Sequence, residues 1–115
     1  MQTKPLVWVG STRDDLSSFG APARREAGHD PWLVQSGRLP RDWRPMPDVG
    51  PGVVEIRVHT EAEHRVFYVA RFEEAVYVLH AFEKRSRKTS RRDLETSRRR
   101  YARVIAQRGA TSRGR

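Results

Sequence analysis

Three consecutive stretches in the second half of the chain have the residue pattern of β-strands. Their predicted bounds are residues 53–59, 65–72 and 75–84. The first alternates, with Val54, Ile56 and Val58 on one face, and the last is apolar on both faces, as expected of a strand with neighbours on each side. Short polar turns at residues 60–64 and 73–74 separate the stretches, so the pattern predicts an antiparallel meander.

The first half of the chain predicts one more strand and two helices. Residues 5–9 are an apolar run with the Val and Trp content typical of a strand. Ser11 or Thr12 is expected to cap a short helix with an acidic first turn, which the helix dipole favours. A second helix is expected over residues 22–37, with a kink or break at Pro31.

A long loop and a final helix complete the predicted order. Residues 37–52 are rich in Gly and Pro, and we expect Trp43 and Met46 to anchor this loop to the core. Ser90 opens the last helix, because Ser90-x-x-Asp93 resembles a capping box. The stripe expected on its packed face, at spacings of three and four, is Leu94, Tyr101, Val104, Ile105 and Arg108.

The expected order, β-α-α-loop-β-β-β-α, describes a small α+β domain with an antiparallel sheet and its helices on one side. With 115 residues, 37% of them hydrophobic, the chain can bury one modest core but not two. We expect residues 1–108 to form this single domain and residues 109–115 to be a flexible basic tail.

Positive charge is concentrated towards the C-terminus. Residues 84–115 hold 13 basic and 2 acidic residues, whereas residues 1–83 hold 10 basic and 12 acidic residues. Of the 23 basic residues, 20 are Arg, whose planar fork suits phosphate groups. This segregated charge indicates a polyanionic partner, with nucleic acid favoured over an acidic protein or a membrane surface.

The composition excludes several other classes of protein. The chain has no cysteine, so disulfide scaffolds and cysteine-based zinc or redox sites are ruled out. No apolar run approaches the length of a membrane span, and the N-terminus lacks the apolar core of a signal peptide, so we expect a cytoplasmic protein. The His and acidic residues lack metal-ligand spacing on one face, so neither a metal nor a cofactor is expected.

Seven short blocks of sequence follow one another in a recognisable order. They are WVGS (8–11), VQSG (34–37), DWRPM (42–46), GVVEIR (52–57), RVFYVA (65–70), EAVYVLHAF (74–82) and KxxxKT (84–89). Together they resemble the phage-derived, HigB-type branch of the RelE/ParE toxin superfamily, over about residues 4–107. The fold implied by this resemblance agrees with the element order expected above.

The resemblance implies a ribosome-dependent mRNA endonuclease, the toxin of a type II toxin–antitoxin pair, which inhibits translation. The implied partners are mRNA, the rRNA of the ribosome and a helix-turn-helix antitoxin. A basic concave sheet face, rather than a metal, carries the chemistry in such proteins. By resemblance, the functional positions are Arg57, Arg65, Lys84 and Lys88. The sequence departs from the family around residues 83–86, where an acid, Glu83, precedes Lys84.

RNA cleavage without a metal has three requirements. The 2′-OH loses a proton, the charge of the transition state is stabilised and the 5′-oxygen gains a proton. Arg65 is the first candidate to stabilise charge, with Arg57 as a second clamp. Lys84 is a candidate for proton transfer, because nearby positive charge would lower its pKa. The alternatives for proton transfer are His64, His59 and Tyr68. The residues expected to bind RNA phosphates are Lys88, Arg85, Arg87, Arg91 and Arg92.

Purely structural roles stay open for these residues. Arg65 has Glu63 or Glu74 as possible ion-pair partners, and Arg57 has Glu73. Lys84, at the end of a strand, would then only keep a sheet edge soluble. Among the histidines, we expect His80 to be a hydrogen-bonded core residue and His59 and His64 to face solvent.

Two other functions on the same fold also stay open. One is a ParE-like inhibitor that binds DNA gyrase, and the other is a catalytically inactive nucleic-acid-binding relative. Arg57, Arg65 and Lys84 favour the nuclease over the gyrase inhibitor, because a protein-binding inhibitor needs no phosphate clamp. Glu83 and the lack of an evident general base keep the inactive relative open.

Overall fold

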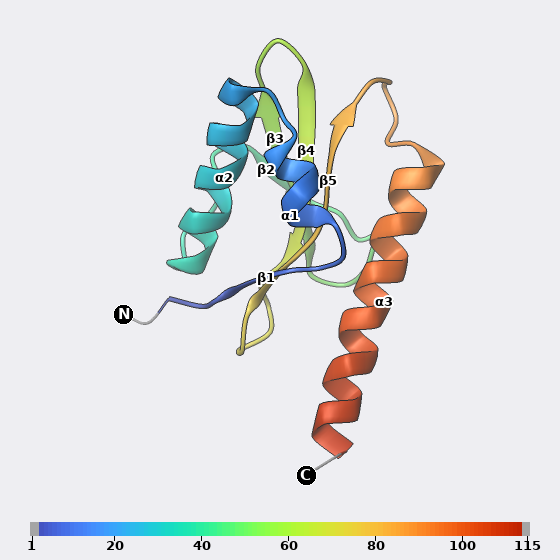
Figure 1. The fold of residues 1–115 in the computed structure, drawn as a ribbon. Coiled ribbons are helices and arrows are strands. Elements are labelled where there is room, and N and C mark those ends of the chain that lie inside the picture. Colours follow the sequence, from blue (N-terminus) through green and yellow to red (C-terminus); the bar gives the residue numbers. More distant parts are fainter. Residues whose placement is uncertain (1–2, 114–115) are drawn as a thin grey trace.

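A five-stranded sheet forms the centre of the computed structural model, which describes residues 3–113 (Figure 1). In chain order the elements are β1 (Leu6–Trp8), α1 (Thr12–Ser17), α2 (Ala21–Gln35), β2 (Trp43–Pro45), β3 (Val53–His59), β4 (Glu63–Val69), β5 (Val76–Lys84) and α3 (Arg91–Arg113). The order of strands across the sheet is β1-β5-β4-β3-β2. The predicted α+β class, with two N-terminal helices and a C-terminal helix, is confirmed.

The predicted meander is present, because β3, β4 and β5 are joined by antiparallel pairing. β2 adds to the outer edge of β3, also antiparallel, whereas β1 pairs with β5 in parallel. The sheet is therefore mixed, and not wholly antiparallel as expected. Residues that lie directly opposite each other on paired strands share one face of the sheet.

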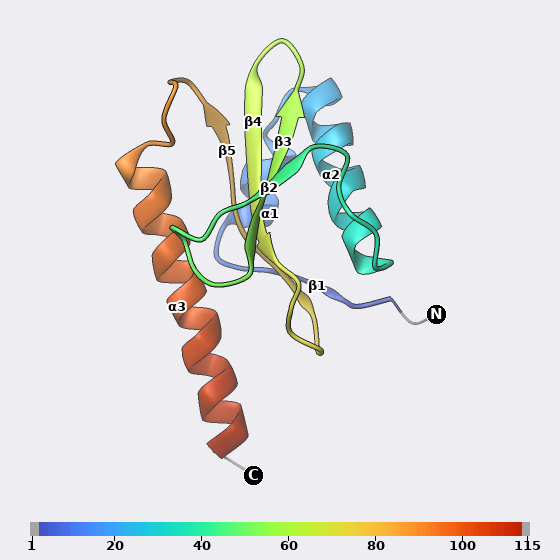
Figure 2. The same ribbon diagram turned by 180° about the vertical axis from the view of Figure 1, so that it is seen from behind.

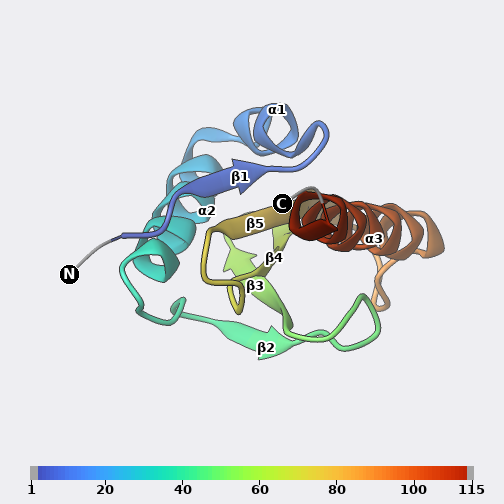
Figure 3. The ribbon, with the colours of Figure 1, turned by 90° about the horizontal axis from the view of Figure 1, so that it is seen from below.

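The helices cover both faces of the sheet, so the expectation that they lie on one side is wrong. α1 and α2 pack on one face, where Phe19 and Ala27 meet Ile56 and Val66. On the other face, Tyr101 and Val104 of α3 pack against strand residues that include Phe67 and Leu79. The views from behind and from below show α2 and α3 on opposite sides of the strands (Figures 2 and 3). The sequence of β5 is apolar on both faces, which already indicated that both faces of the sheet are covered.

β2 lies inside the stretch that we expected to be a loop. Only three residues long, it pairs Trp43 with Ile56 and ends at Pro45, a residue that an edge strand tolerates. The side chain of Trp43 is 37% exposed and does not anchor this segment, whereas Met46 is buried as expected. The strand escaped prediction because its pairing partner, and not its own pattern, makes it a strand.

The N-terminal helices differ from expectation in two details. Pro31 is buried within α2, and the helix continues past it to Gln35 without a break. Neither Ser11 nor Thr12 caps α1 through its side chain. The buried Thr12 hydroxyl instead donates to the carbonyls of Val9 and Leu79, which attaches the start of α1 to β5.

Ser90 caps α3 as predicted, because the backbone N–H of Asp93 donates to Oγ of Ser90 over 3.1 Å. The Asp93 carboxylate accepts from the Ser90 hydroxyl over 2.6 Å, in place of the backbone N–H that it would bind in a full capping box. The expected packed stripe fails at Ile105, which is 39% exposed. α3 continues to Arg113, through the first residues of the stretch expected to be a tail, and residues 114–115 lie outside the described part. Within residues 3–113, no helix is long and apolar enough to cross a membrane.

Candidate functional site

Polar residues of four strands meet on the sheet face that also carries α3. They lie at the end of the sheet where β3 turns into β4 (Figure 1). Strand pairing places them in three rows across the sheet. The rows are His59–Glu63–Lys84, Arg57–Arg65–Phe82 and Arg44–Glu55–Phe67–His80. The three predicted catalytic positions, Arg57, Arg65 and Lys84, therefore lie on one face and in adjacent rows.

A buried carboxylate lies at the centre of these cations. Glu55 is fully buried, and its oxygens lie 2.9 Å from Nε of Arg44, 3.2 Å from Nε of Arg57 and 3.8 Å from Nε of Arg65. The three guanidinium groups would repel one another in its absence. Glu55 thus allows three arginines of three strands to gather on one patch and leaves a net positive charge there.

Arg65 lies deeper than its neighbours. Its side chain is 7% exposed, and its terminal Nη1 donates to Oε1 of Glu63 over 3.1 Å and to the carbonyl of His64 over 3.0 Å. Arg57 and Arg44 are more accessible, at 31% and 48% exposed. Arg65 therefore pairs with Glu63, one of its two structural alternatives, and Arg57 pairs with Glu55 and not with Glu73.

Lys84 lies at the end of β5, directly opposite Glu63 in the register. Its pKa is lowered, first by desolvation and then by the positive charge of Arg65. We expected like-charge repulsion alone to have this effect, so the direction agrees and the main cause differs. An ammonium group with a lowered pKa is better suited to exchange a proton near neutral pH.

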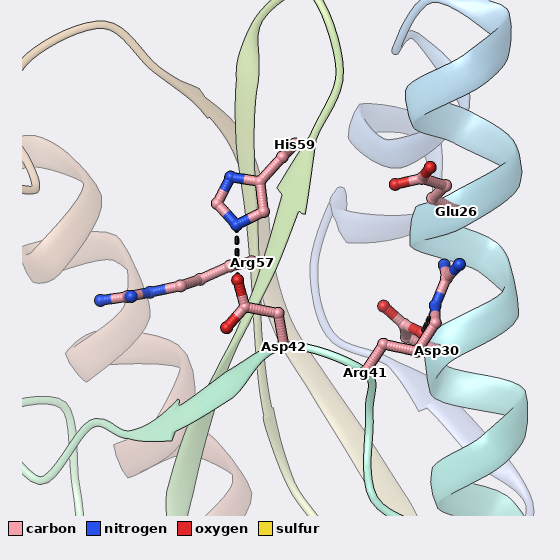
Figure 4. A pocket seen from close by; sticks show the side chains of 6 residues that line it. All are labelled: Glu26, Asp30, Arg41, Asp42, Arg57 and His59. Carbon is pink, nitrogen blue, oxygen red and sulfur yellow. Dashed lines mark hydrogen bonds and ion pairs between the residues drawn. The ribbon is translucent and has the colours of Figure 1, made fainter.

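His59 is exposed, as expected, and its ring lies between two carboxylates. Nδ1 lies 2.8 Å from both oxygens of Glu63, and Nε2 bonds to Asp42 (Figure 4). Both contacts favour the imidazolium, so the pKa of His59 is raised, with Asp42 as the larger cause. The ring borders a pocket of about 140 Å³, whose lining residues are Glu26, Asp30, Arg41, Asp42, Arg57 and His59.

Two of the alternatives for proton transfer lie on the wrong face. His64 is buried against the ring of Phe19, with 4.2 Å between ring centroids, so the expectation that it faces solvent is wrong. Tyr68 is buried in the core under α1 and α2, and burial raises its pKa to about 12. The alternation of β4 assigns both residues to the face opposite Arg65.

His80 is a hydrogen-bonded core histidine, as expected. Its Nε2 lies 2.8 Å from Oδ1 of Asp93, and burial lowers its pKa. Arg100 of α3 also points inwards and donates to the carbonyl of Leu79 over 3.0 Å. These contacts attach the first half of α3 to β5.

Arg44 and Asp42 join the site without having been predicted as site residues. Arg44 joins the site only through β2, where it lies opposite Glu55. The carbonyl of Asp42 accepts a hydrogen bond from the N–H of Arg57 over 2.9 Å, and this bond fixes Asp42 beside β3. The DWRPM block contains both residues, and this short block was the one available signal.

The predicted RNA-binding residues lie in the β5–α3 connection and the first turn of α3. All five of them are exposed: Arg85, Arg87, Lys88, Arg91 and Arg92. This connection lies at the same end of the sheet as the β3–β4 turn (Figures 1 and 2). Arg85 makes an ion pair of 3.3 Å with Glu83. This pair offsets part of the negative charge that Glu83 places beside Lys84.

Within the described residues, no group of three or more His, Cys, Asp or Glu side chains is placed to hold a metal ion. Asp42 and Glu63 contact different nitrogens of the His59 ring. They therefore do not converge with the ring on a common point.

Comparison with known proteins gives one family. The sequence pattern described as "Phage derived protein Gp49-like (DUF891)" matches residues 14–102. This match extends from α1 into α3 and includes all the site residues described above. No curated protein matches the chain.

Proposed function

Because the chain belongs to the Gp49-like phage-derived family, which is associated with RelE/HigB-type toxins, we propose that it is the toxin of a type II toxin–antitoxin pair and cleaves mRNA on the ribosome. The observation that supports this most is the gathering of Arg57, Arg65 and Lys84 on one sheet face around a buried carboxylate. A fixed set of cations of this kind is suited to stabilise the charge of a phosphoryl-transfer transition state.

The accessible cations would hold the scissile phosphate. Arg57 and Arg44 present guanidinium groups that are anchored at Nε by Glu55, so their orientation is fixed before RNA binds. Arg65, deeper in the sheet, adds positive charge beneath the phosphate and holds Glu63. This assigns to Arg65 a positioning and electrostatic role, in place of the direct clamp expected from the sequence.

Lys84 would accept the proton of the ribose 2′-OH. Its lowered pKa increases the fraction of neutral amine, which is the form that acts as a base. The 2′-oxygen then attacks phosphorus, and the 5′-oxygen departs. The expected products are a 2′,3′-cyclic phosphate and a 5′-hydroxyl end.

The exposed basic segment would guide the protein to its target. Arg85, Arg87, Lys88, Arg91 and Arg92 adjoin Lys84 along the chain and present charge for the mRNA and rRNA backbones. Action on ribosomes places the proposed activity in the cytoplasm. A helix-turn-helix antitoxin, encoded beside the toxin, would be the partner that holds it inactive.

Primer-extension mapping of cellular mRNAs after induced expression tests this function. Wild-type protein should produce discrete cuts within translated frames, and Arg57→Ala should abolish them. Arg13→Ala, which changes an exposed arginine of α1, is the matched control and should cut as wild type does. DNA damage without RNA cuts would instead indicate a gyrase inhibitor, and absence of toxicity would indicate an inactive relative. Either result would overturn the proposal.

A further inference from the structure

The proposed reaction needs a second proton carrier. Lys84 takes the proton of the 2′-OH, but the departing 5′-oxygen needs a proton from another group. His59 lies in the same row as Lys84, with β4 between their strands. Strands are spaced by about 4.8 Å, so the two backbones are about 10 Å apart. Glu63 lies between them in this row, and its carboxylate is bound to Nδ1 of His59.

The ring of His59 is held in place by residues of two other segments. Glu63 contacts Nδ1, and Glu63 is itself fixed by Nη1 of the buried Arg65. Asp42 contacts Nε2 and comes from the segment before β2, with its side chain 45% exposed. Glu63 is 42% exposed, so exposure does not distinguish the two carboxylates. Nδ1 has a partner that the buried Arg65 holds, whereas the Asp42 side chain has no other hydrogen bond among the described residues and is free to turn away from Nε2.

The charges around His59 favour a protonated ring. Acidic groups face it from β4, from α2 and from the segment before β2, and two arginines line the same pocket. They are Glu63 on β4, Asp42 before β2, Glu26 and Asp30 on α2, and the cations Arg41 and Arg57. Asp30 is bonded to Arg41 over 3.1 Å, so Asp42 and Glu63 are the carboxylates that act directly on the ring. Figure 4 shows the ring aimed at Asp42, with Arg57 extending away from it.

We propose that His59 is the general acid of this cleavage reaction, an inference that rests on the function proposed above. When RNA binds, Nε2 leaves Asp42 and faces the 5′-oxygen, while Glu63 keeps Nδ1 in place. As the 2′-oxygen forms its bond to phosphorus, the 2′-OH proton passes to the Lys84 amine. The P–O5′ bond then breaks, and the Nε2 proton passes to the 5′-oxygen. Solvent reprotonates the ring, whose side chain is 51% exposed.

A substrate with an altered leaving group tests this role. The 5′-oxygen at a mapped cleavage site is replaced by sulfur in a synthetic mRNA bound to programmed ribosomes. A thiolate leaves without protonation, so the need for a general acid disappears. His59→Gln should cleave the ordinary mRNA at least about 100-fold more slowly than wild type, and should cleave the sulfur substrate at close to the wild-type rate.

The controls separate the possible failures. His29→Gln, at an exposed histidine of α2, should match wild type on both substrates. Full activity of His59→Gln on ordinary mRNA, or an equal loss on both substrates, would remove His59 from the role of general acid and leave the proposed function intact. Absence of cleavage of either substrate by the wild type would overturn the proposed function itself.

Discussion

The buried side chain of Glu55 organises the cations at the scale of single residues. It accepts contacts from arginines of β2, β3 and β4, and it is fully buried itself. Arg65 also donates a hydrogen bond to Glu63, and Glu63 in turn contacts Nδ1 of the His59 ring. The face therefore has a connected set of charges, in which a change at a buried member shifts the exposed ones.

Arg65→Met should destabilise the fold more than Arg57→Ala does. Loss of the buried Arg65 removes the arginine partner of Glu63 and one of the three arginines around the buried Glu55, and breaking a buried pair costs about 3 kcal/mol. Arg57 is 31% exposed, and without it the buried Glu55 keeps Arg44 and Arg65 as partners, so its loss should cost less. Urea denaturation of both variants measures the difference in the free energy of unfolding. Equal losses would contradict the buried arrangement of Arg65.

The histidines should titrate on opposite sides of 6.5. The pKa of His59 is raised by Asp42 and Glu63, so its contribution to stability is present below pH 6.5 and is lost as pH rises through the folded-state pKa. Burial lowers the pKa of His80, so its contribution is present above pH 6.5 and is lost as pH falls. NMR titration of the ring protons checks both directions. A midpoint for His59 below that of His80 would refute this assignment.

At the scale of elements, α3 is the helix that covers the second face of the sheet, and it is fixed at both ends. Its start is fixed by Ser90 and by the bond between Asp93 and His80. Its far end is fixed by Arg108. The guanidinium carbon (Cζ) of Arg108 lies 3.8 Å from the ring centroid of Phe72, and the same group pairs with Glu74. This pair lowers the pKa of Glu74 to about 2. The helix thus holds the basic β5–α3 connection at a fixed place beside Lys84.

Ser90→Ala should loosen the first turn of α3. Removal of the cap leaves the N–H of Asp93 without its acceptor, at a cost of about 1 kcal/mol. Hydrogen exchange should become faster in residues 91–94 and remain unchanged in β3 and β4. Ser90→Thr retains the hydroxyl and is the matched variant. An effect of similar size in both variants would show that the cap does not hold this turn.

For the molecule as a whole, sequence patterns predicted the features that neighbouring residues determine, such as individual strands and a helix cap. The three strands within residues 53–84 and the Ser90 cap were evident from pattern and spacing, whereas the register of the paired strands placed Arg57, Arg65 and Lys84 on one face. The parallel pairing of β1, the edge strand β2 and the second covered face depend on contacts distant in sequence. Those contacts also determine the burial of Arg65 and bring Arg44 into the site.

The segregated charge should make RNA binding depend strongly on salt. Replacing Arg91 and Arg92 together by Ala should lower the slope of log affinity against log salt concentration by about 1 for each phosphate contact that is lost. The matched control replaces Arg24 and Arg25, two exposed arginines of α2. Fluorescence anisotropy with single-stranded RNA at several KCl concentrations gives the slopes. The same decrease in both double variants would deny the basic segment a specific role.

The chemistry of the cut ends tests the central claim most directly. If this sheet face activates the 2′-OH, purified protein acting on mRNA in programmed ribosomes should leave 2′,3′-cyclic phosphate on the upstream fragment and a 5′-hydroxyl on the downstream fragment. Lys84→Met should leave the RNA uncut. Upstream fragments ending in 3′-hydroxyl, with 5′-phosphate on the downstream ones, would mean that water and not the 2′-OH is the nucleophile, and would contradict the account.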